Sequence, residues 1–235
     1  MDPLTPSRPA ATPRVFVVMA AFNEETVIES VVERLQAAYP NIVIVDDGST
    51  DATAERLRRS KAHLLRHSIN RGQGAALQTG IRFALLKGAE VIVTFDADGQ
   101  HSEQDIDRLI NPIVQKECEV TLGSRFLGRA DDMPPTRRIL LKAGILFTRI
   151  VSRIRISDVH NGLRAFSRRA AASLDIRMDR MAHASEILDQ IRQNGWRYRE
   201  IPVHIRYSAY SVAKGQSSWN ALVISSQILF RKLSK

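Results

Sequence analysis

The sequence has 235 residues, of which 44% are hydrophobic and 25% charged, a composition typical of a soluble globular protein. Lysine and arginine outnumber aspartate and glutamate by 34 to 25, and the net charge of +9 favours anionic partners such as phosphorylated ligands, anionic lipid or nucleic acid. The single cysteine, Cys118, excludes an internal disulfide and a cysteine-rich zinc site, and agrees with a reducing compartment. Since no run of about 18 uncharged apolar residues occurs, we predict no transmembrane helix.

Residues 1–13 hold four prolines and no apolar core, so we predict a disordered leader and no signal peptide. From residue 14 onwards, short apolar runs that predict strands alternate with amphipathic segments that predict helices. The predicted strands are 15–19, 42–45, 62–65, 91–95 and 120–123. Because these runs are apolar on both faces, we expect an α/β fold: a three-layer sandwich with a mostly parallel central sheet.

The second half of the chain contains two basic amphipathic segments. Residues 137–156 have apolar side chains at helical spacing with arginines and a lysine between them, and residues 219–235 repeat this composition. Such C-terminal amphipathic helices can lie on a membrane surface or bind a membrane-protein partner. A domain helix with a solvated basic face explains residues 137–156 equally well.

Two carboxylates, Asp96 and Asp98, directly follow the predicted strand 91–95, and Gln100 comes next. Open α/β folds bind their ligands at the carboxyl edge of the sheet, where these side chains would lie. Hard oxygen donors suit Mg²⁺ or Mn²⁺ holding a diphosphate, although a charged turn would have the same pattern. We expect His101 to start the next helix and not to bind metal.

Three other predicted strands are followed by polar loops. Asp47, at the end of strand 42–45, could accept hydrogen bonds from a nucleobase or ribose, or could cap the next helix. Gly72 and Gly74 precede a helix and are weak evidence for a phosphate cradle, because the chain has no P-loop lysine there. Arg125, after strand 120–123, could pair with a phosphate or form a surface ion pair.

Five motifs in order are similar to those of the inverting family 2 glycosyltransferases, closest to the dolichol-phosphate and polyprenyl-phosphate sugar synthases. They are Ala20-Ala21-Phe22-Asn23-Glu24-Glu25, Val45-Asp46-Asp47-Gly48-Ser49-Thr50-Asp51, Asn70-Arg71-Gly72-Gln73-Gly74, Asp96-Ala97-Asp98-Gly99-Gln100-His101 and Gly123-Ser124-Arg125. The resemblance implies a GT-A nucleotide-sugar-binding fold over residues 14–210. Residues 211–235 would then be a late loop and a basic amphipathic helix.

The resemblance also implies roles for individual residues. Asp96, Asp98 and Gln100 would hold the metal, Asp158 and Arg164 would lie on the acceptor side, and Asp98, Arg125 and Glu186 would act in catalysis. The nucleotide sugar would contact Ala20, Phe22, Glu24, Val45, Asp47, Asp96, Ala97, Asp98, Gln100, Arg125 and Lys214. The chain departs from the family where Phe22 replaces a tyrosine and where Ser218 replaces a lysine that ends the late loop, and Lys214 could substitute for that lysine.

The expected activity is metal-dependent transfer of a sugar from UDP or GDP to a polyprenyl phosphate, in the cytoplasm or on the cytoplasmic face of the membrane. An acceptor phosphate is already anionic and needs no general base. Two alternatives stay open: transfer to a saccharide hydroxyl, for which Glu186 would be the base, and a non-catalytic module that binds nucleotide sugar. No basic patch interleaved with aromatic residues supports nucleic-acid binding.

Overall fold

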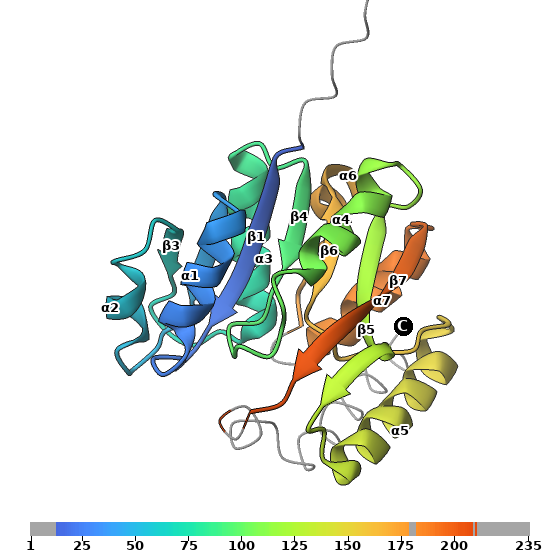
Figure 1. The fold of residues 1–235 in the computed structure, drawn as a ribbon. Helices are drawn as coiled ribbons and strands as arrows, with labels where there is room; N and C mark the ends of the chain where they lie inside the picture. The colour runs from blue at the N-terminus through green and yellow to red at the C-terminus, as the bar shows by residue number, and fades with distance from the viewer. Residues whose placement is uncertain (1–12, 179–181, 209, 211–235) are drawn as a thin grey trace, which may run out of the picture.

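The computed structural model describes residues 13–178, 182–208 and 210, which form a mixed α/β fold (Figure 1). In this part of the chain seven strands form one sheet, in the order β3-β2-β1-β4-β6-β5-β7. The strands are β1 (Val15–Ala21), β2 (Ile42–Asp46), β3 (His63–Arg66), β4 (Val91–Thr94), β5 (Val120–Asp131), β6 (Arg164–Ser167) and β7 (Tyr198–Arg206). Neighbouring strands are parallel except that β6 runs antiparallel to both β4 and β5, so the expected mostly parallel sheet is confirmed.

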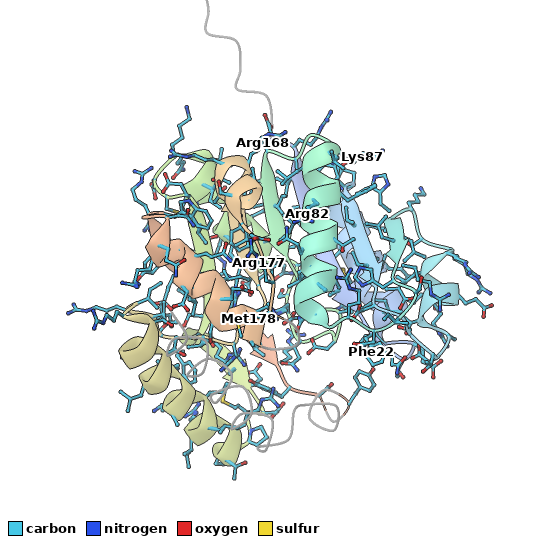
Figure 2. The ribbon with its side chains drawn as sticks, turned by 180° about the vertical axis from the view of Figure 1, so that it is seen from behind. Phe22, Arg82, Lys87, Arg168, Arg177 and Met178 are labelled. Carbon is cyan, nitrogen blue, oxygen red and sulfur yellow. The ribbon has the colours of Figure 1, made fainter. Side chains whose placement is uncertain are left out.

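Helices cover both faces of the sheet because the strands are apolar on both faces. The described helices are α1 (Ile28–Ala38), α2 (Thr53–Leu57), α3 (Gln73–Leu86), α4 (Asp105–Val114), α5 (Pro135–Ser152), α6 (Arg168–Ser173) and α7 (His183–Gln193). Along β1, Val17 and Met19 pack with α1 and α4, while Phe16 and Val18 pack with α3, α6 and α7. Figure 2 shows α3 and α7 on this second face, seen from behind. The result is the expected three-layer sandwich.

The reversed strand β6 brings a later part of the chain to the carboxyl edge of the sheet. Its first residue, Arg164, pairs in register with Thr94 at the end of β4 and with Leu122 of β5. Because β6 runs the other way, its start lies where the parallel strands end. The polar segment 158–163, which leads into β6, therefore meets the loop that follows β4.

A bulge interrupts the pairing of β5 with β7. Ser124 pairs with Pro202 and Arg129 with His204, so residues 125–128 of β5 oppose Val203 alone. Bulges redirect side chains next to functional sites. Gly128 lies so close to the β7 backbone that a Cβ atom there would be 2.2 Å from the carbonyl oxygen of Val203. This bulge begins at Arg125, which faces the cleft described below.

The structure differs from the sequence-based expectations in several elements. The strand predicted at 120–123 continues to Asp131, and the basic helix begins at Pro135 and ends at Ser152, where Arg153 has a left-handed φ of 50°. Strands β6 and β7 and helices α6 and α7 were not predicted. The basic segment 219–235 lies outside the described residues. Within the part of the chain that the structure covers, none of the helices combines the length and apolar character that crossing a bilayer requires.

We predict that Gly128→Ala lowers the free energy of unfolding by about 2 kcal/mol, because the new methyl group would overlap the β7 backbone. Gly144→Ala in α5 is the matched control. Its Cβ would lie 3.4 Å from His160 Nε2, an ordinary contact, and alanine favours the helix. Urea denaturation of both variants measures the difference. Equal stability of the two variants would contradict the close approach of Gly128 to the β7 backbone.

Candidate active site

One cleft with a volume of about 380 Å³ lies at the carboxyl edge of the sheet. Of the residues singled out from the sequence for the site, those lining it are Ala20, Phe22, Glu24, Asp47, Gly72, Asp96, Ala97, Asp98, Gln100, Arg125 and Arg164. Phe22 is 39% exposed, and Figure 2 shows its labelled side chain projecting beyond the end of β1. Val45, Asp158 and Glu186 are buried without lining the cleft. Lys214 lies outside the described residues.

The carboxylate of Asp96 is held on both oxygens. The amide of Gln73 donates to Oδ1 at 3.0 Å, and His101 Nε2 lies 2.9 Å from Oδ2. Gly162 closes the remaining side, since a Cβ atom there would lie 2.2 Å from each carboxylate oxygen. Burial alone would raise the pKa of Asp96, but the hydrogen bond and charge of His101, with the charges of His183 and Arg164, lower it. Asp96 is therefore a fixed, ionised group.

Asp98 lies in a more negative environment. Its Oδ1 accepts a hydrogen bond from the backbone N–H of Gln100 at 3.0 Å. Burial, followed by the charge of Asp96, raises the pKa of Asp98 to about 6, and Glu24 adds to this effect. An excess of negative charge on hard oxygen donors is an environment that fits a divalent cation. No group of three or more potential ligands gathers among the residues described, so a bound diphosphate would have to supply further oxygens.

Asp47 organises the glycine-containing loop. Its oxygens accept hydrogen bonds from the backbone N–H groups of Arg71 at 3.0 Å and Gly72 at 2.7 Å, and His67 Nδ1 lies 2.7 Å away. Gly72 has a φ of 91°, which favours glycine. The N–H of Gly72 therefore binds a carboxylate of the protein itself. The structure gives this loop a role in placing Gln73 beside Asp96.

Arg125 forms a dense set of contacts at the opposite end of the cleft. Its Nε donates to Asp158 Oδ2 at 2.6 Å, its Nη1 to the Tyr207 hydroxyl at 2.6 Å, and its Nη2 to the carbonyl of His160 at 3.0 Å. Asp158 also accepts from the backbone N–H of Arg125 at 3.1 Å. Asp158 thus orients Arg125 from behind the cleft.

Arg164 connects the two ends of the cleft. Its side chain donates to the carbonyls of Asn161 and Val159, each at 3.0 Å, and so holds the segment before β6. Burial lowers the pKa of Arg164 to about 10, while the charges of Asp96 and Asp158 oppose this effect. Arg164 therefore keeps its positive charge at neutral pH between these two carboxylates.

Glu186, in α7, holds the backbone of a neighbouring segment. Its Oε2 accepts hydrogen bonds from the backbone N–H groups of Arg177 at 2.9 Å and Met178 at 2.7 Å. Figure 2 shows both residues beside α7 on the rear face. Gly74 packs against this segment, because a Cβ atom there would lie 2.3 Å from the Met178 carbonyl oxygen. The action of Glu186 as a general base stays a sequence-based prediction.

Several residues in or beside the cleft were not predicted from the sequence. His101 was expected only to start a helix. Its position directly after the carboxylate motif was a sequence signal that could have placed it in the site. Arg137, in the first turn of α5, and His160 line the cleft beside Arg125. Tyr210 donates a hydrogen bond from its hydroxyl to Glu24 Oε2 at 2.9 Å. Nothing in the local sequence indicates these long-range partners.

The comparisons with known proteins define the class. Residues 16–174 match the family described as Glycosyl transferase family 2, and the chain belongs to this family. It is 32% identical to a UDP-N-acetylglucosamine–dolichyl-phosphate N-acetylglucosaminyltransferase of Methanococcus voltae, over 94% of this chain and 97% of the relative. It is 30% identical to a polyprenol monophosphomannose synthase of Mycolicibacterium smegmatis, over 92% and 85% of the two chains.

Solved structures confirm the GT-A-like fold. Glucosyl-3-phosphoglycerate synthase from Mycobacterium tuberculosis, in complex with Mn²⁺ and UDP-glucose, superposes with a TM-score of 0.72. The match covers 95% of this chain and 79% of the other at 19% identity. The chain is therefore a family 2 glycosyltransferase, as its five sequence motifs indicate.

We predict a pH-dependent stability that is due to His160. Burial, with the charges of Arg125, Arg164 and Arg137, lowers the pKa of His160 to about 4. As the pH falls below about 6.5, the unfolded chain binds a proton that the folded chain excludes, so stability falls until about pH 4. We expect the loss of unfolding free energy between pH 7 and pH 5 to be about 2 kcal/mol smaller in His160→Gln, measured by urea denaturation. An identical loss in both proteins would contradict a neutral His160.

Proposed function

We propose that the protein transfers a sugar from a nucleoside diphosphate sugar to a polyprenyl phosphate. The observation that carries this proposal is the separation of charge along one cleft. Glu24, Asp96 and Asp98 form a negative end, and Arg125 and Arg137 line the other end. A single metal–diphosphate site would account for the carboxylates of the negative end. The arginines of the other end would need a second anion. A lipid phosphate acceptor supplies it.

The negative end suits the donor. Asp96 and Asp98 would hold Mg²⁺ or Mn²⁺, with Gln100 beside them, and the metal when bound would neutralise charge on the leaving diphosphate. Gln73, His101 and Gly162 fix the direction of the Asp96 carboxylate before substrate arrives. Glu24, Asp47 and Phe22 would lie toward the nucleoside, which agrees with their place at the β1 and β2 end of the cleft.

The positive end suits an anionic acceptor. An oxygen of the acceptor phosphate would attack the anomeric carbon of the sugar from the side opposite the diphosphate. The new C–O bond forms as the bond to the diphosphate breaks, the electron pair leaves with the nucleoside diphosphate, and the configuration is inverted. No proton has to be removed from a phosphate anion. This fits a cleft whose lining, in the described part of the chain, does not include Glu186.

The relatives are consistent with this acceptor class. Two of them are a dolichyl-phosphate N-acetylglucosaminyltransferase and a polyprenol monophosphomannose synthase, and a third is an undecaprenyl-phosphate mannosyltransferase. These names belong to the relatives. For this chain they support a polyprenyl phosphate acceptor without selecting the sugar or choosing between UDP and GDP.

A donor panel tests the proposal. UDP- and GDP-sugars are incubated with Mn²⁺ or Mg²⁺, with and without polyprenyl phosphate, and labelled sugar is measured in the organic phase. We expect acceptor-dependent release of nucleoside diphosphate and a labelled lipid whose sugar is released by mild acid. Label found only on water-soluble saccharide would favour a hydroxyl acceptor. Binding of nucleotide sugar without any turnover would favour a non-catalytic module.

We predict that Asp98→Asn lowers the transfer rate at least about 100-fold, because it removes a charged metal ligand worth several kcal/mol in the transition state. Glu33→Gln, on the exposed face of α1, is the control and should keep the wild-type rate. Initial rates at saturating metal compare the two variants. An Asp98→Asn enzyme with the wild-type rate would contradict the assigned metal site.

The outer face of α5 would place the cleft at an anionic membrane surface. Ile139 and Leu146 are 70% and 60% exposed, and Arg138, Lys142 and Arg149 are exposed on the same helix. Apolar side chains mixed with cations bind bilayers that contain anionic lipid. Figure 1 shows α5 at the lower edge of the molecule, next to the ends of β5 and β7.

We predict that the double variant Ile139→Glu with Leu146→Glu binds vesicles containing anionic lipid at least about tenfold more weakly than wild type. Leu86→Glu with Val114→Glu is the control, because it adds the same two negative charges at exposed positions at the ends of α3 and α4. Vesicle co-sedimentation measures binding. Equal loss in the control and the double variant would show that net charge alone governs binding. Wild-type binding by the double variant would remove α5 from the membrane contact.

A further inference from the structure

Tyr207, the first residue after β7, contacts two arginines that come from other elements. Its hydroxyl oxygen accepts a hydrogen bond from Arg125 Nη1 at 2.6 Å. The guanidinium carbon of Arg137 lies 5.2 Å from the centre of the Tyr207 ring, in a cation–π contact. Tyr207 is 5% exposed, so both contacts are shielded from solvent on the tyrosine side.

The position of Tyr207 is set by the sheet. Asp131 at the end of β5 pairs with Arg206 at the end of β7, and the N–H of Tyr207 donates to the Asp131 carbonyl at 3.2 Å. Arg125 lies upstream on β5, and α5, which carries Arg137, begins at Pro135, shortly after Asp131. One backbone ladder therefore aligns the tyrosine with both arginines.

The contacts leave positive charge available in the cleft. Asp158 forms an ion pair with Arg125, but among the described residues no carboxylate pairs with Arg137, whose Nε is buried without a hydrogen-bond partner. Arg125 has five N–H donors, and the three bonds to Asp158, Tyr207 and His160 leave one N–H on each terminal nitrogen.

A phenol is suited to hold two guanidinium groups together. It offers an oxygen to one and the face of its ring to the other, and it carries no negative charge that would compete with an anionic ligand. A carboxylate in the same place would neutralise one arginine. His160, which also lines this end of the cleft and is surrounded by arginines, likewise contributes no negative charge.

We propose that Tyr207 is a positioning residue that holds Arg125 and Arg137 as a two-arginine clamp for the phosphate of the acceptor. The inference rests on the proposed function, because it assigns the anion at this end of the cleft to the acceptor. Tyr207 acts through the arginines and touches no reacting atom. Its effect should therefore fall on acceptor binding and leave donor binding unchanged.

The test compares two substitutions of Tyr207 with a matched control on β7, the strand that Tyr207 directly follows. Tyr207→Phe removes the hydroxyl and keeps the ring, whereas Tyr207→Leu removes both contacts. Tyr198→Phe is the control, since the Tyr198 hydroxyl donates to the Arg155 carbonyl at 2.9 Å on the exposed side of β7. For each protein KM for polyprenyl phosphate, KM for the nucleotide sugar, kcat and the melting temperature are measured.

We expect Tyr207→Phe to raise the acceptor KM about tenfold, as loss of one charge-assisted hydrogen bond should, with the donor KM within about twofold of wild type. Tyr207→Leu should raise the acceptor KM further, because Arg137 also loses its ring contact. Tyr198→Phe should match wild type. If Tyr207→Leu does not fold, the comparison of Tyr207→Phe with Tyr198→Phe decides the matter.

Two failures are distinguishable. If the wild-type protein transfers no sugar to polyprenyl phosphate with any donor, the proposed function is wrong. If the wild-type protein does so but Tyr207→Phe keeps the wild-type acceptor KM, only the role of Tyr207 is wrong. An equal rise of donor and acceptor KM together with a lower melting temperature would likewise overturn it, by showing a general structural role.

Discussion

The cleft depends on one buried positive charge, that of Arg164. It lies between Asp96, which belongs to the negative end, and Asp158, which orients Arg125 at the other end. A buried guanidinium is stable only when carboxylates and carbonyls surround it, and Arg164 has both. Because β6 runs against its neighbours, Arg164 reaches the carboxyl edge from the opposite direction. The reversed strand thus joins two sites that the parallel strands alone would leave separate.

The two ends of the cleft follow different electrostatic rules. At the negative end, burial and the charge of Asp96 raise the cost of ionising Asp98, which a divalent cation would relieve. At the other end, Arg125 forms an ion pair with Asp158, and Tyr207 brings Arg137 close without adding negative charge. Each end therefore has a charge that its own side chains leave uncompensated. Under the proposed function, these two charges would let the cleft bind two anionic substrates side by side with little rearrangement.

The local pattern of the sequence predicts what lies directly after a strand and little else. Asp96 and Asp98 follow an apolar run, so the sheet edge and the cleft could be inferred from them. The roles of Gln73 and Gly162 could not, because their contacts with Asp96 join separate segments of the chain. Tyr207 is 82 residues from Arg125, and β7, which carries it to the cleft, was not recognised as a strand. Periodicity detects burial, whereas side-chain partners are set by the order of strands.

Helix α5 is where the electrostatics of the cleft and the outer surface of the molecule meet. Its first turn supplies Arg137 to the positive end, and Ile139, two residues later, is exposed on the outside. Successive residues on a helix point in different directions, so one turn is enough to face both the cleft and the exterior. An acceptor phosphate at the membrane surface would then have only the width of one helix to cross. Under the proposed function, a helix after β5 would fix the distance between Arg137 and the outer apolar residues, which a flexible loop would not do.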